Sequence, residues 1–218
     1  MSTTIRHPHP PVQPADHAHV TDLETCLDLI NTVELTDGIP EDRLPTVTDA
    51  LSWFDRTGVA HVHDLQAQAG TSPDAWLARV QAARASLRDV WDAAVDGRAA
   101  ASTAVETLND ILARAPHPEL RSAPDGVSVG HRHDAADPTG EALARVAAPL
   151  VDALAVGDTS RFRVCANDGC RWVFEDTSRG GRRRWCDMTT CGNRAKVRRF
   201  RSKRRNPADP VGERPPEG

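Results

Sequence analysis

The chain has 218 residues, of which 39% are hydrophobic and 27% are charged, and its formal net charge is −4. This length fits one large domain or two smaller ones. No stretch approaches the roughly 18 apolar residues that a membrane-spanning helix needs, and the Pro-rich first twenty residues contain no apolar secretion-signal core. We therefore expect a cytoplasmic protein with no membrane partner.

The small net charge is the sum of two large opposite charges. Residues 1–160 contain 11 Lys and Arg against 24 Asp and Glu, a net charge of −13. Residues 161–205 contain 15 Lys and Arg against 4 acidic residues, a net charge of +11. This contrast favours two modules with different partners, and the basic module requires a polyanion.

The N-terminal module is predicted to be mainly helical. Residues 1–19 are polar and rich in Pro and His, which predicts a disordered tail. The module itself is expected over residues 20–157. The spacing of its apolar residues predicts helices over residues 22–33, 46–57, 59–69, 72–97, 103–115 and 137–157.

Local signals mark the ends of several of these helices. Ser72-Pro73-Asp74 combines an N-cap, a proline at the first helical position and an early acid. Thr103 and Glu106 have the spacing of a capping box, with Val105 and Leu108 expected to face the core. Pro149 should kink the last helix, because proline cannot donate the backbone hydrogen bond of a helix interior.

Two turns interrupt this helical pattern. Residues 37–40, Asp-Gly-Ile-Pro, predict a turn. Residues 119–122 and 127–129 flank Ala-Pro-Asp-Gly and predict a β-hairpin. The N-terminal domain is thus expected to be an α+β domain, mainly α with one small β-hairpin.

Four cysteines in the basic segment have the spacing of a metal site. Cys165 and Cys170 form one C-x4-C pair, and Cys186 and Cys191 form a second after fifteen residues. Such pairs can place four sulfurs on one tetrahedron, the geometry of Zn²⁺ in structural sites. The alternatives are two disulfides, which a reducing cytoplasm disfavours, and four free thiols. We expect one structural Zn²⁺, and the fifth cysteine, Cys26, as a buried core thiol.

The elements around these cysteines predict a treble-clef-like finger over residues 161–205. Residues 172–174 and 183–185 flank a Gly-rich turn and predict a hairpin between the two cysteine pairs. Gly192-Asn193 should then begin a helix that reaches residue 205 and holds the last cysteine in its first turn. Residues 206–218 are expected to be a disordered tail.

The helix after the last cysteine is cationic. From Arg179 to Arg205 the chain has 12 Lys and Arg against one acid, which exceeds what solubility requires. Val197 and Phe200 are expected to pin this helix to the hairpin. The predicted nucleic-acid contacts are Arg179, Arg182, Arg183, Arg184, Arg194, Lys196, Arg198, Arg199, Arg201, Lys203, Arg204 and Arg205.

Two tryptophans in the finger allow two interpretations. Trp172 and Trp185 could stack on bases, as aromatic residues of single-strand binders do. Both are adjacent or close in sequence to cysteines of the predicted metal site. Packing beside the metal is therefore the favoured interpretation.

The finger closely resembles the CGNR zinc finger family. The resemblance lies in Cys165-Ala-Asn-Asp-Gly-Cys170 and in Trp185-Cys-Asp-Met-Thr-Thr-Cys191-Gly-Asn-Arg194. Residues 27–32, Leu-Asp-Leu-Ile-Asn-Thr, are similar to the opening of ABATE, a helical domain that usually precedes this finger and is described as a stress-induced transcription regulator. The resemblance implies a bacterial, nucleic-acid-binding regulator, with both DNA and RNA proposed as targets.

These observations lead to one expected function and two alternatives. The expected protein is a transcription regulator that binds DNA through the finger, which would bring it to the nucleoid. Its N-terminal domain is expected to bind a small-molecule or protein effector. RNA binding by the same cations is one alternative. The other is a protein-interaction module in which the acidic domain shields the basic finger. No nucleophile with its base, phosphate-binding Gly loop or H-E-x-x-H motif is found, so no enzyme is expected.

Two polar clusters in the N-terminal domain have weaker signals. Asp28 and Asn31 share a helix face at i, i+3, either in a polar pocket or, as favoured, hydrogen-bonded to the following loop. Eight of the nine histidines fall in His-x-His pairs. One pair, His131 and His133, could form a metal site with Asp134 and Asp137, but surface histidines beside a loop are the default interpretation.

Overall fold

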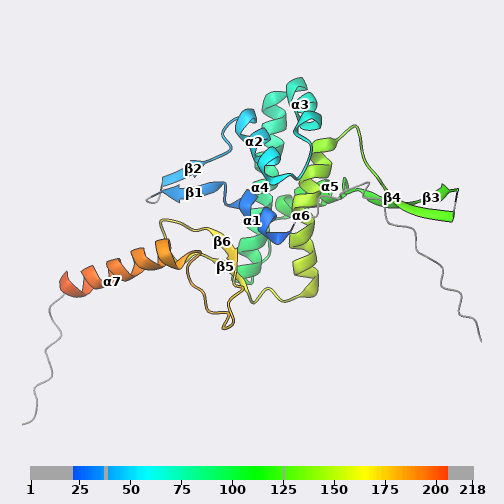
Figure 1. The fold of residues 1–218 in the computed structure, drawn as a ribbon. Helices are drawn as coiled ribbons and strands as arrows, with labels where there is room; N and C mark the ends of the chain where they lie inside the picture. The colour runs from blue at the N-terminus through cyan, green and yellow to red at the C-terminus, as the bar shows by residue number, and fades with distance from the viewer. Residues whose placement is uncertain (1–21, 37–38, 125, 206–218) are drawn as a thin grey trace, which may run out of the picture.

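The computed structural model describes residues 22–36, 39–124 and 126–205 (Figure 1). In chain order the elements are α1 (Leu23–Ile30), β1 (Val33–Thr36), β2 (Ile39–Asp42), α2 (Val47–Thr57), α3 (Val62–Thr71), α4 (Pro73–Asp96), α5 (Ser102–Leu112), β3 (His117–Ala123), β4 (Gly126–Arg132), α6 (Pro138–Val156), β5 (Phe162–Val164), β6 (Val173–Glu175), a π-helical turn η1 (Met188–Gly192) and α7 (Asn193–Arg205). Both terminal tails, for which disorder was predicted, lie outside the described residues.

The predicted fold class is confirmed. Among the described residues, helices are joined by three separate antiparallel strand pairs, β1–β2, β3–β4 and β5–β6. None of the helices in this part of the chain is long and apolar enough to cross a membrane.

Helix α4 lies at the centre of the N-terminal domain. Its apolar side chains recur every three or four residues and therefore form one buried stripe. That stripe consists of Trp76, Val80, Ala83, Leu87 and Trp91. Helices α1 and α6 pack against it (Figure 1), and each large apolar side chain buried there contributes roughly 1.5–3 kcal/mol.

The predicted helices are present, but not every predicted cap is. Helix α2 begins with a capping box between Thr46 and Asp49 and ends at Gly58 in the left-handed conformation, which glycine adopts without a steric penalty. The capping box predicted at Thr103 is wrong, because α5 already begins at Ser102. Its start is fixed by Asp89 of α4, whose carboxylate accepts a hydrogen bond from the backbone N–H of Ala101 at 2.7 Å.

Two further details of the helices differ from expectation. Val105 was expected to face the core, but 42% of it is exposed. Ser72 precedes α4 as predicted, yet its side chain makes no capping hydrogen bond. Pro149 lies inside α6, and the kink expected there stays a prediction.

The hairpins were predicted unevenly. The β3–β4 hairpin is confirmed, with register from His117 opposite Arg132 to Ala123 opposite Gly126. The β1–β2 hairpin was missed, because Val33 was placed at the end of a helix and instead pairs with Asp42. Residues 37–38 of the predicted turn lie outside the described residues.

Candidate metal centre and nucleic-acid interface

The finger is attached to the N-terminal domain through a shared core. Phe162 of β5 and Val173 of β6 belong to the same buried cluster as the helices. Trp91 of α4 stacks on Phe162 with ring centroids 4.0 Å apart and planes 9° from parallel. Its indole N–H donates to the backbone carbonyl of Arg163 at 3.1 Å. The finger is therefore built onto the end of α4.

Asn31 forms a second connection between the two modules. Its side-chain amide donates to the carbonyl of Val173 at 3.0 Å, and its side-chain oxygen accepts from the N–H of Val173 at 2.9 Å. Asn31 thus pairs with β6 as a neighbouring strand would. The favoured prediction of bonding to the following loop is wrong here, because the partner lies 142 residues away.

Asp28 also bonds beyond its own loop. Its carboxylate accepts hydrogen bonds from the indole of Trp53 at 2.7 Å and from Arg56 at 3.1 Å, both in α2. Asp28 and Asn31 line a cavity of about 470 Å³ whose wall includes Trp172 of the finger. The polar-pocket interpretation therefore describes the pair better than the local one.

The finger hairpin differs from the predicted one. Strand β6 pairs with β5, which precedes the first cysteine, and not with residues 183–185. The reason is burial, because β5 contributes Phe162 to the core of the N-terminal domain. The expected partner segment, residues 183–185, is held by single contacts, such as the Arg184 carbonyl that accepts from the N–H of Ala166 at 2.8 Å.

A buried carboxylate organises the loop after β6. Asp176 is fully buried and accepts hydrogen bonds from the backbone N–H groups of Ser178 at 3.0 Å and Arg183 at 2.7 Å. The Ser178 hydroxyl also donates to Asp176. This hydrogen bond has the largest effect on the carboxyl group and lowers the pKa of Asp176. Sequence reasoning missed this residue, although an Asp followed by Thr-Ser is a common start of a hydrogen-bonded turn.

The four predicted metal ligands come together at the base of this loop. The sulfurs of Cys165, Cys170, Cys186 and Cys191 all lie within 4.8 Å of one another. None of these cysteines is in a disulfide. Cys26 is also free and fully buried, as predicted, and burial raises the pKa of its thiol to about 12.

The electrostatics of this cluster favour a cation among the sulfurs. A hydrogen bond from Cys186 lowers the pKa of the Cys165 thiol to about 5, and the same contact raises the pKa of Cys186. Burial raises the pKa of Cys170 to about 11. Four sulfurs this close cannot all ionise by themselves, because like charges repel, whereas a divalent ion removes that conflict.

Neighbouring residues support this role. The side-chain amide of Asn167 donates to the sulfur of Cys191 at 3.5 Å, as donors around thiolate metal sites do. Cys191 lies on η1, which starts after Asp187, whose side chain accepts from the N–H of Thr190 at 2.8 Å. The helical segment thus begins one turn earlier than predicted, with Asp187 as its cap and not Asn193.

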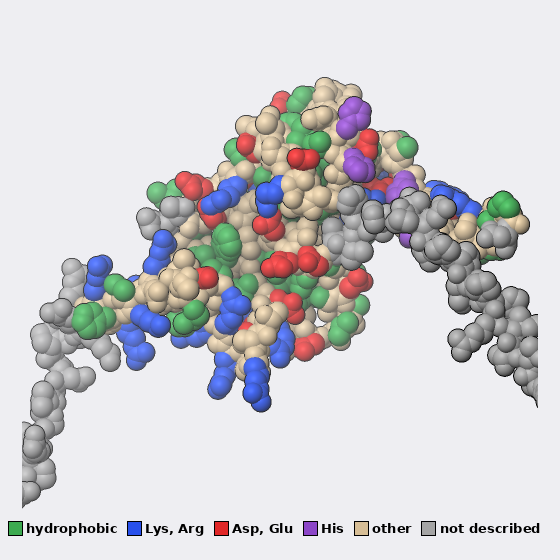
Figure 2. All heavy atoms as spheres, viewed as in Figure 1, with side chains coloured by type: hydrophobic (Ala, Val, Ile, Leu, Met, Phe, Trp, Pro, Cys, Tyr) green, Lys and Arg blue, Asp and Glu red, His purple; other side chains and the backbone are tan. Residues whose placement is uncertain are grey.

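The predicted cationic residues fall into three groups. Most have exposed side chains and gather over the finger and α7, whereas acidic side chains predominate on the visible face of the helical domain (Figure 2). Arg183 instead points inward, with its guanidinium 4.9 Å from the ring centre of Phe174 and bonded to the carbonyl of Cys186. The side chains of residues 203–205 lie outside those described. The exposed group is Arg179, Arg182, Arg184, Arg194, Lys196, Arg198, Arg199 and Arg201.

The apolar residues of the finger are only partly where they were expected. Trp185 packs against the cysteine cluster, as predicted. Trp172 was expected to do the same, but 37% of it is exposed and it lines the cavity beside Asn31. Val197 and Phe200 were expected to pin α7 to the hairpin and are instead 48% and 61% exposed. α7 has its main contacts with η1 and extends from the body (Figure 1).

The metal site considered at His131, His133, Asp134 and Asp137, which the default interpretation disfavoured, does not hold its donor atoms together. Asp137 caps α6 by accepting from the N–H of Gly140 at 2.9 Å and is held by Arg79 at 2.6 and 2.7 Å. The Arg79 guanidinium holds the pKa of Asp137 far below its usual range. His131, His133 and Asp134 line a cavity that is separate from the one beside Asp28 and Asn31, and Asp137 is not part of its lining.

The structure combines a helical domain with a finger whose four clustered cysteines could hold a metal ion, and comparison with known families agrees with this arrangement. The model of the CGNR zinc finger matches residues 161–204. The ABATE model, described as "Putative stress-induced transcription regulator", matches residues 23–157, more than half of the chain. The chain therefore belongs to the ABATE family and carries a CGNR zinc finger. No curated protein matches it.

Proposed function

We propose that this protein is a zinc-dependent regulator of transcription that binds duplex DNA through its finger. The observation that carries the proposal is the group of exposed Arg and Lys side chains on α7 and the adjoining loop, next to the four-sulfur cluster. The two family matches support the same class of protein.

Zinc has a structural role in this proposal. Cys165, Cys170, Cys186 and Cys191 would hold one Zn²⁺, because four thiolates are a common ligand set of structural zinc sites. All four come from loops and from η1, so the ion would fix the start of α7 relative to the β5–β6 hairpin. Its bound thiolates carry a net charge of about −2, which partly offsets the surrounding cations.

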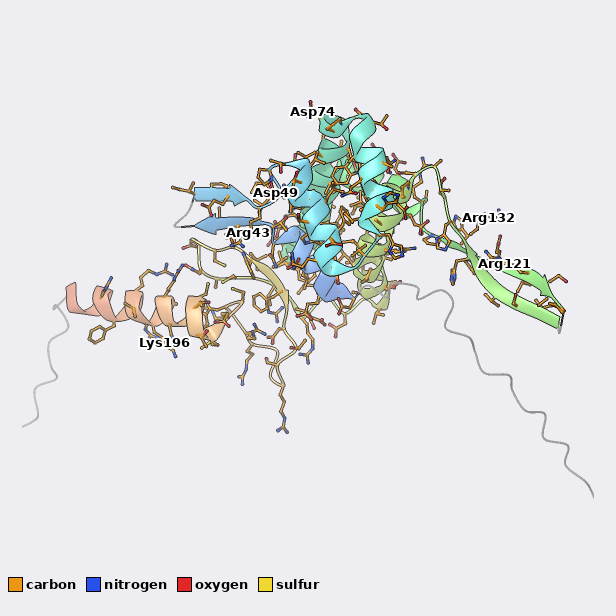
Figure 3. The ribbon with its side chains drawn as sticks, turned by 45° about the horizontal axis from the view of Figure 1, so that its top comes forward. Arg43, Asp49, Asp74, Arg121, Arg132 and Lys196 are labelled. Carbon is orange, nitrogen blue, oxygen red and sulfur yellow. The ribbon has the colours of Figure 1, made fainter. Side chains whose placement is uncertain are left out.

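Helix α7 is the part of this surface suited to a DNA groove. An α-helix fits the major groove of B-DNA, and Arg194, Arg198 and Arg201 are spaced i, i+4, i+7 on one ridge. Lys196 lies on a neighbouring ridge, from which it would bind backbone phosphates. Figure 3 shows Lys196 on α7, at the opposite end of the molecule from Arg121 and Arg132 on the β3–β4 hairpin.

The two alternatives are less well supported. The acidic domain leaves the cations of α7 exposed, which disfavours a shielded finger. Trp172 lines the junction with the N-terminal domain, and Trp185 packs beside the cysteines, so neither forms an open platform for the unstacked bases of RNA. We place the effector of the N-terminal domain in the cavity that Trp172 and Asn31 share, since a ligand there would contact both modules.

The proposal is tested by changing cations on α7 and two elsewhere. We expect Arg198→Ala with Arg201→Ala to weaken binding to duplex DNA. Lys196→Ala should reduce the slope of log affinity against log salt by about 0.9, for one lost phosphate contact. The matched control is Arg121→Ala with Arg132→Ala, which removes two exposed arginines from the β3–β4 hairpin. Equal DNA affinity of the double α7 variant and the parent would refute the proposal. If structured RNA competes successfully with duplex DNA for the protein, the target is RNA and not DNA.

A further inference from the structure

Four histidines that are distant in sequence line one cavity. His61 and His63 lie at the start of α3, whereas His131 and His133 lie at the end of β4 and just beyond it. All four belong to the lining of a cavity of about 950 Å³. Only one other histidine, His117, occurs among the described residues. The fold therefore brings together two of the His-x-His pairs that the cysteine site and the DNA surface do not use.

Figure 2 shows this gathering directly, with histidine side chains collected between α3 and the base of the β3–β4 hairpin. The same cavity is lined by three carboxylates, from Asp64, Asp134 and Glu141. Imidazole nitrogens together with carboxylate oxygens are a common ligand set for divalent zinc, nickel, cobalt and iron.

One of these histidines is already oriented as a metal ligand is. The Nδ1 atom of His133 lies 2.7 Å from a carboxylate oxygen of Glu141. A carboxylate that accepts a hydrogen bond from Nδ1 leaves Nε2 as the ring atom that can bind a metal ion. A carboxylate that holds the other ring nitrogen is the usual partner of a metal-binding histidine.

Glu141 is itself fixed in place. It is 7% exposed and bonded to Arg145, which also donates to the carbonyl of Val59 at 3.1 Å. The carboxylate therefore orients His133 from a rigid position on α6. A surface histidine with no such partner would lose more rotamer freedom on binding an ion.

We propose that this cavity is a second metal site, which takes one divalent transition-metal ion through His61, His63, His131 and His133. Among the described residues only the four cysteines already hold their donor atoms together, so the other histidines turn toward the entering ion while His133 keeps its contact with Glu141. An exposed side chain such as that of His63 changes rotamer at a small cost in free energy. The bound ion would tie the start of α3 to the end of β4.

The site differs in chemistry from the cysteine cluster. Thiolates select soft or borderline ions, whereas imidazole and carboxylate ligands also suit Ni²⁺. The inference does not depend on nucleic-acid binding, since the cavity is lined by α3, β4 and α6 and not by the finger. A regulator with this site would respond to the availability of a metal ion.

The test uses the full chain without an affinity tag, with its cysteines loaded with Zn²⁺, and titrates Ni²⁺ by calorimetry. We expect one Ni²⁺ to bind per chain with no release of zinc. Changing His61, His63, His131 and His133 to Gln should weaken this binding by at least about tenfold. The ion should also slow amide exchange in residues 61–64 and 131–135 of the parent.

The matched control removes four other histidines. His7, His9, His17 and His19 are changed to Gln in the same background, and His117→Gln is measured as a single variant. Ni²⁺ binding should survive in both. Equal binding by the cavity variant and the parent, loss of binding in the N-terminal variant, or zinc release that matches nickel uptake would each overturn the proposal. Circular dichroism checks that the cavity variant remains folded. If the cavity variant does not fold, the single variant His133→Gln is used in its place, and it should also weaken Ni²⁺ binding.

Discussion

The two modules of this protein are stabilised in different ways. The helical domain has a continuous apolar core that includes Trp91, Leu87 and Leu143, each almost fully buried. The finger has a far smaller cluster of its own, in which Phe174 and Trp185 pack beside the cysteines. Its remaining buried apolar residues, Phe162 and Val173, belong to the core of the helical domain.

The small core of the finger has two supports from outside it. One is the surface of α1 and α4, which contacts its β5–β6 hairpin. The other, in the proposed function, is a cation held by its four sulfurs. The four predictions below use this difference between the modules, from the largest expected effect to the smallest.

Removal of the metal should separate the two modules most clearly. Chelation should remove about 10–16 kcal/mol of apparent folding free energy from the finger, Cys170→Ala should remove part of it, and both should leave α4 folded. Hydrogen exchange is the measurement, and it should show lost protection from residue 165 onward but not in α4. Cys26→Ala is the control, because it removes a buried thiol without loss of metal. Persistent protection of residues 186–200 after chelation would show that the finger stays folded without the metal.

Loss of the Trp91 ring should destabilise both modules together. Trp91→Ala removes the stack on Phe162 and the hydrogen bond to Arg163, at a cost of about 3–5 kcal/mol in the free energy of unfolding. Urea denaturation followed by circular dichroism measures this loss. Trp172→Ala serves as the comparison, since its ring is 37% exposed and should cost under about 1 kcal/mol. Similar losses in the two variants would contradict the shared core.

The Asn31 connection should contribute less. Asn31→Ala leaves the N–H and carbonyl of Val173 without their partner, which costs about 1–3 kcal/mol where these groups are buried. The increase in amide exchange should concentrate in β6. Asn109→Ala, an exposed position on α5, should change neither stability nor exchange. Faster exchange throughout α4 but not in β6 would argue against a specific link.

The smallest effect concerns Asp137 and depends on pH. Its pKa is lowered in the folded protein by Arg79, so the ionised form stabilises the fold above the unfolded pKa of 3.8. That contribution is lost as the pH falls below about 4 toward the folded pKa. Asp137→Asn should therefore cost about 1–2 kcal/mol at pH 7 and progressively less at lower pH. A loss that is the same at pH 7 and pH 3 would exclude this origin.

The sequence predicted those parts of the fold that local patterns determine. The apolar stripe of α4 and the pairing of the β3–β4 hairpin each depend on residues a few positions apart. The four cysteines were found for the same reason, because their spacing alone restricts where the sulfurs can meet. In each case the signal and the structure occupy the same short segment.

Several of the errors arise where a distant segment decides the structure. Asn31 bonds to a strand 142 residues away, and β6 pairs with β5 because Phe162 finds its place against Trp91. The false capping box at Thr103 has the same cause, since Asp89 of α4 fixes the start of α5. The convergence of His61 and His133 on one cavity was equally invisible to a search for ligands within one short segment.

The central claim is that a metal-ordered group of cations binds duplex DNA, and salt-dependent binding tests it most directly. Fluorescence anisotropy of a labelled duplex is measured over a range of salt concentrations, with the full chain before and after zinc is removed. Eight exposed cations on the finger predict that log affinity falls with log salt at a slope of about −3 or steeper for the zinc-loaded protein. The affinity should be much weaker once zinc is removed. Binding that ignores salt, or that is unchanged without zinc, would contradict the account.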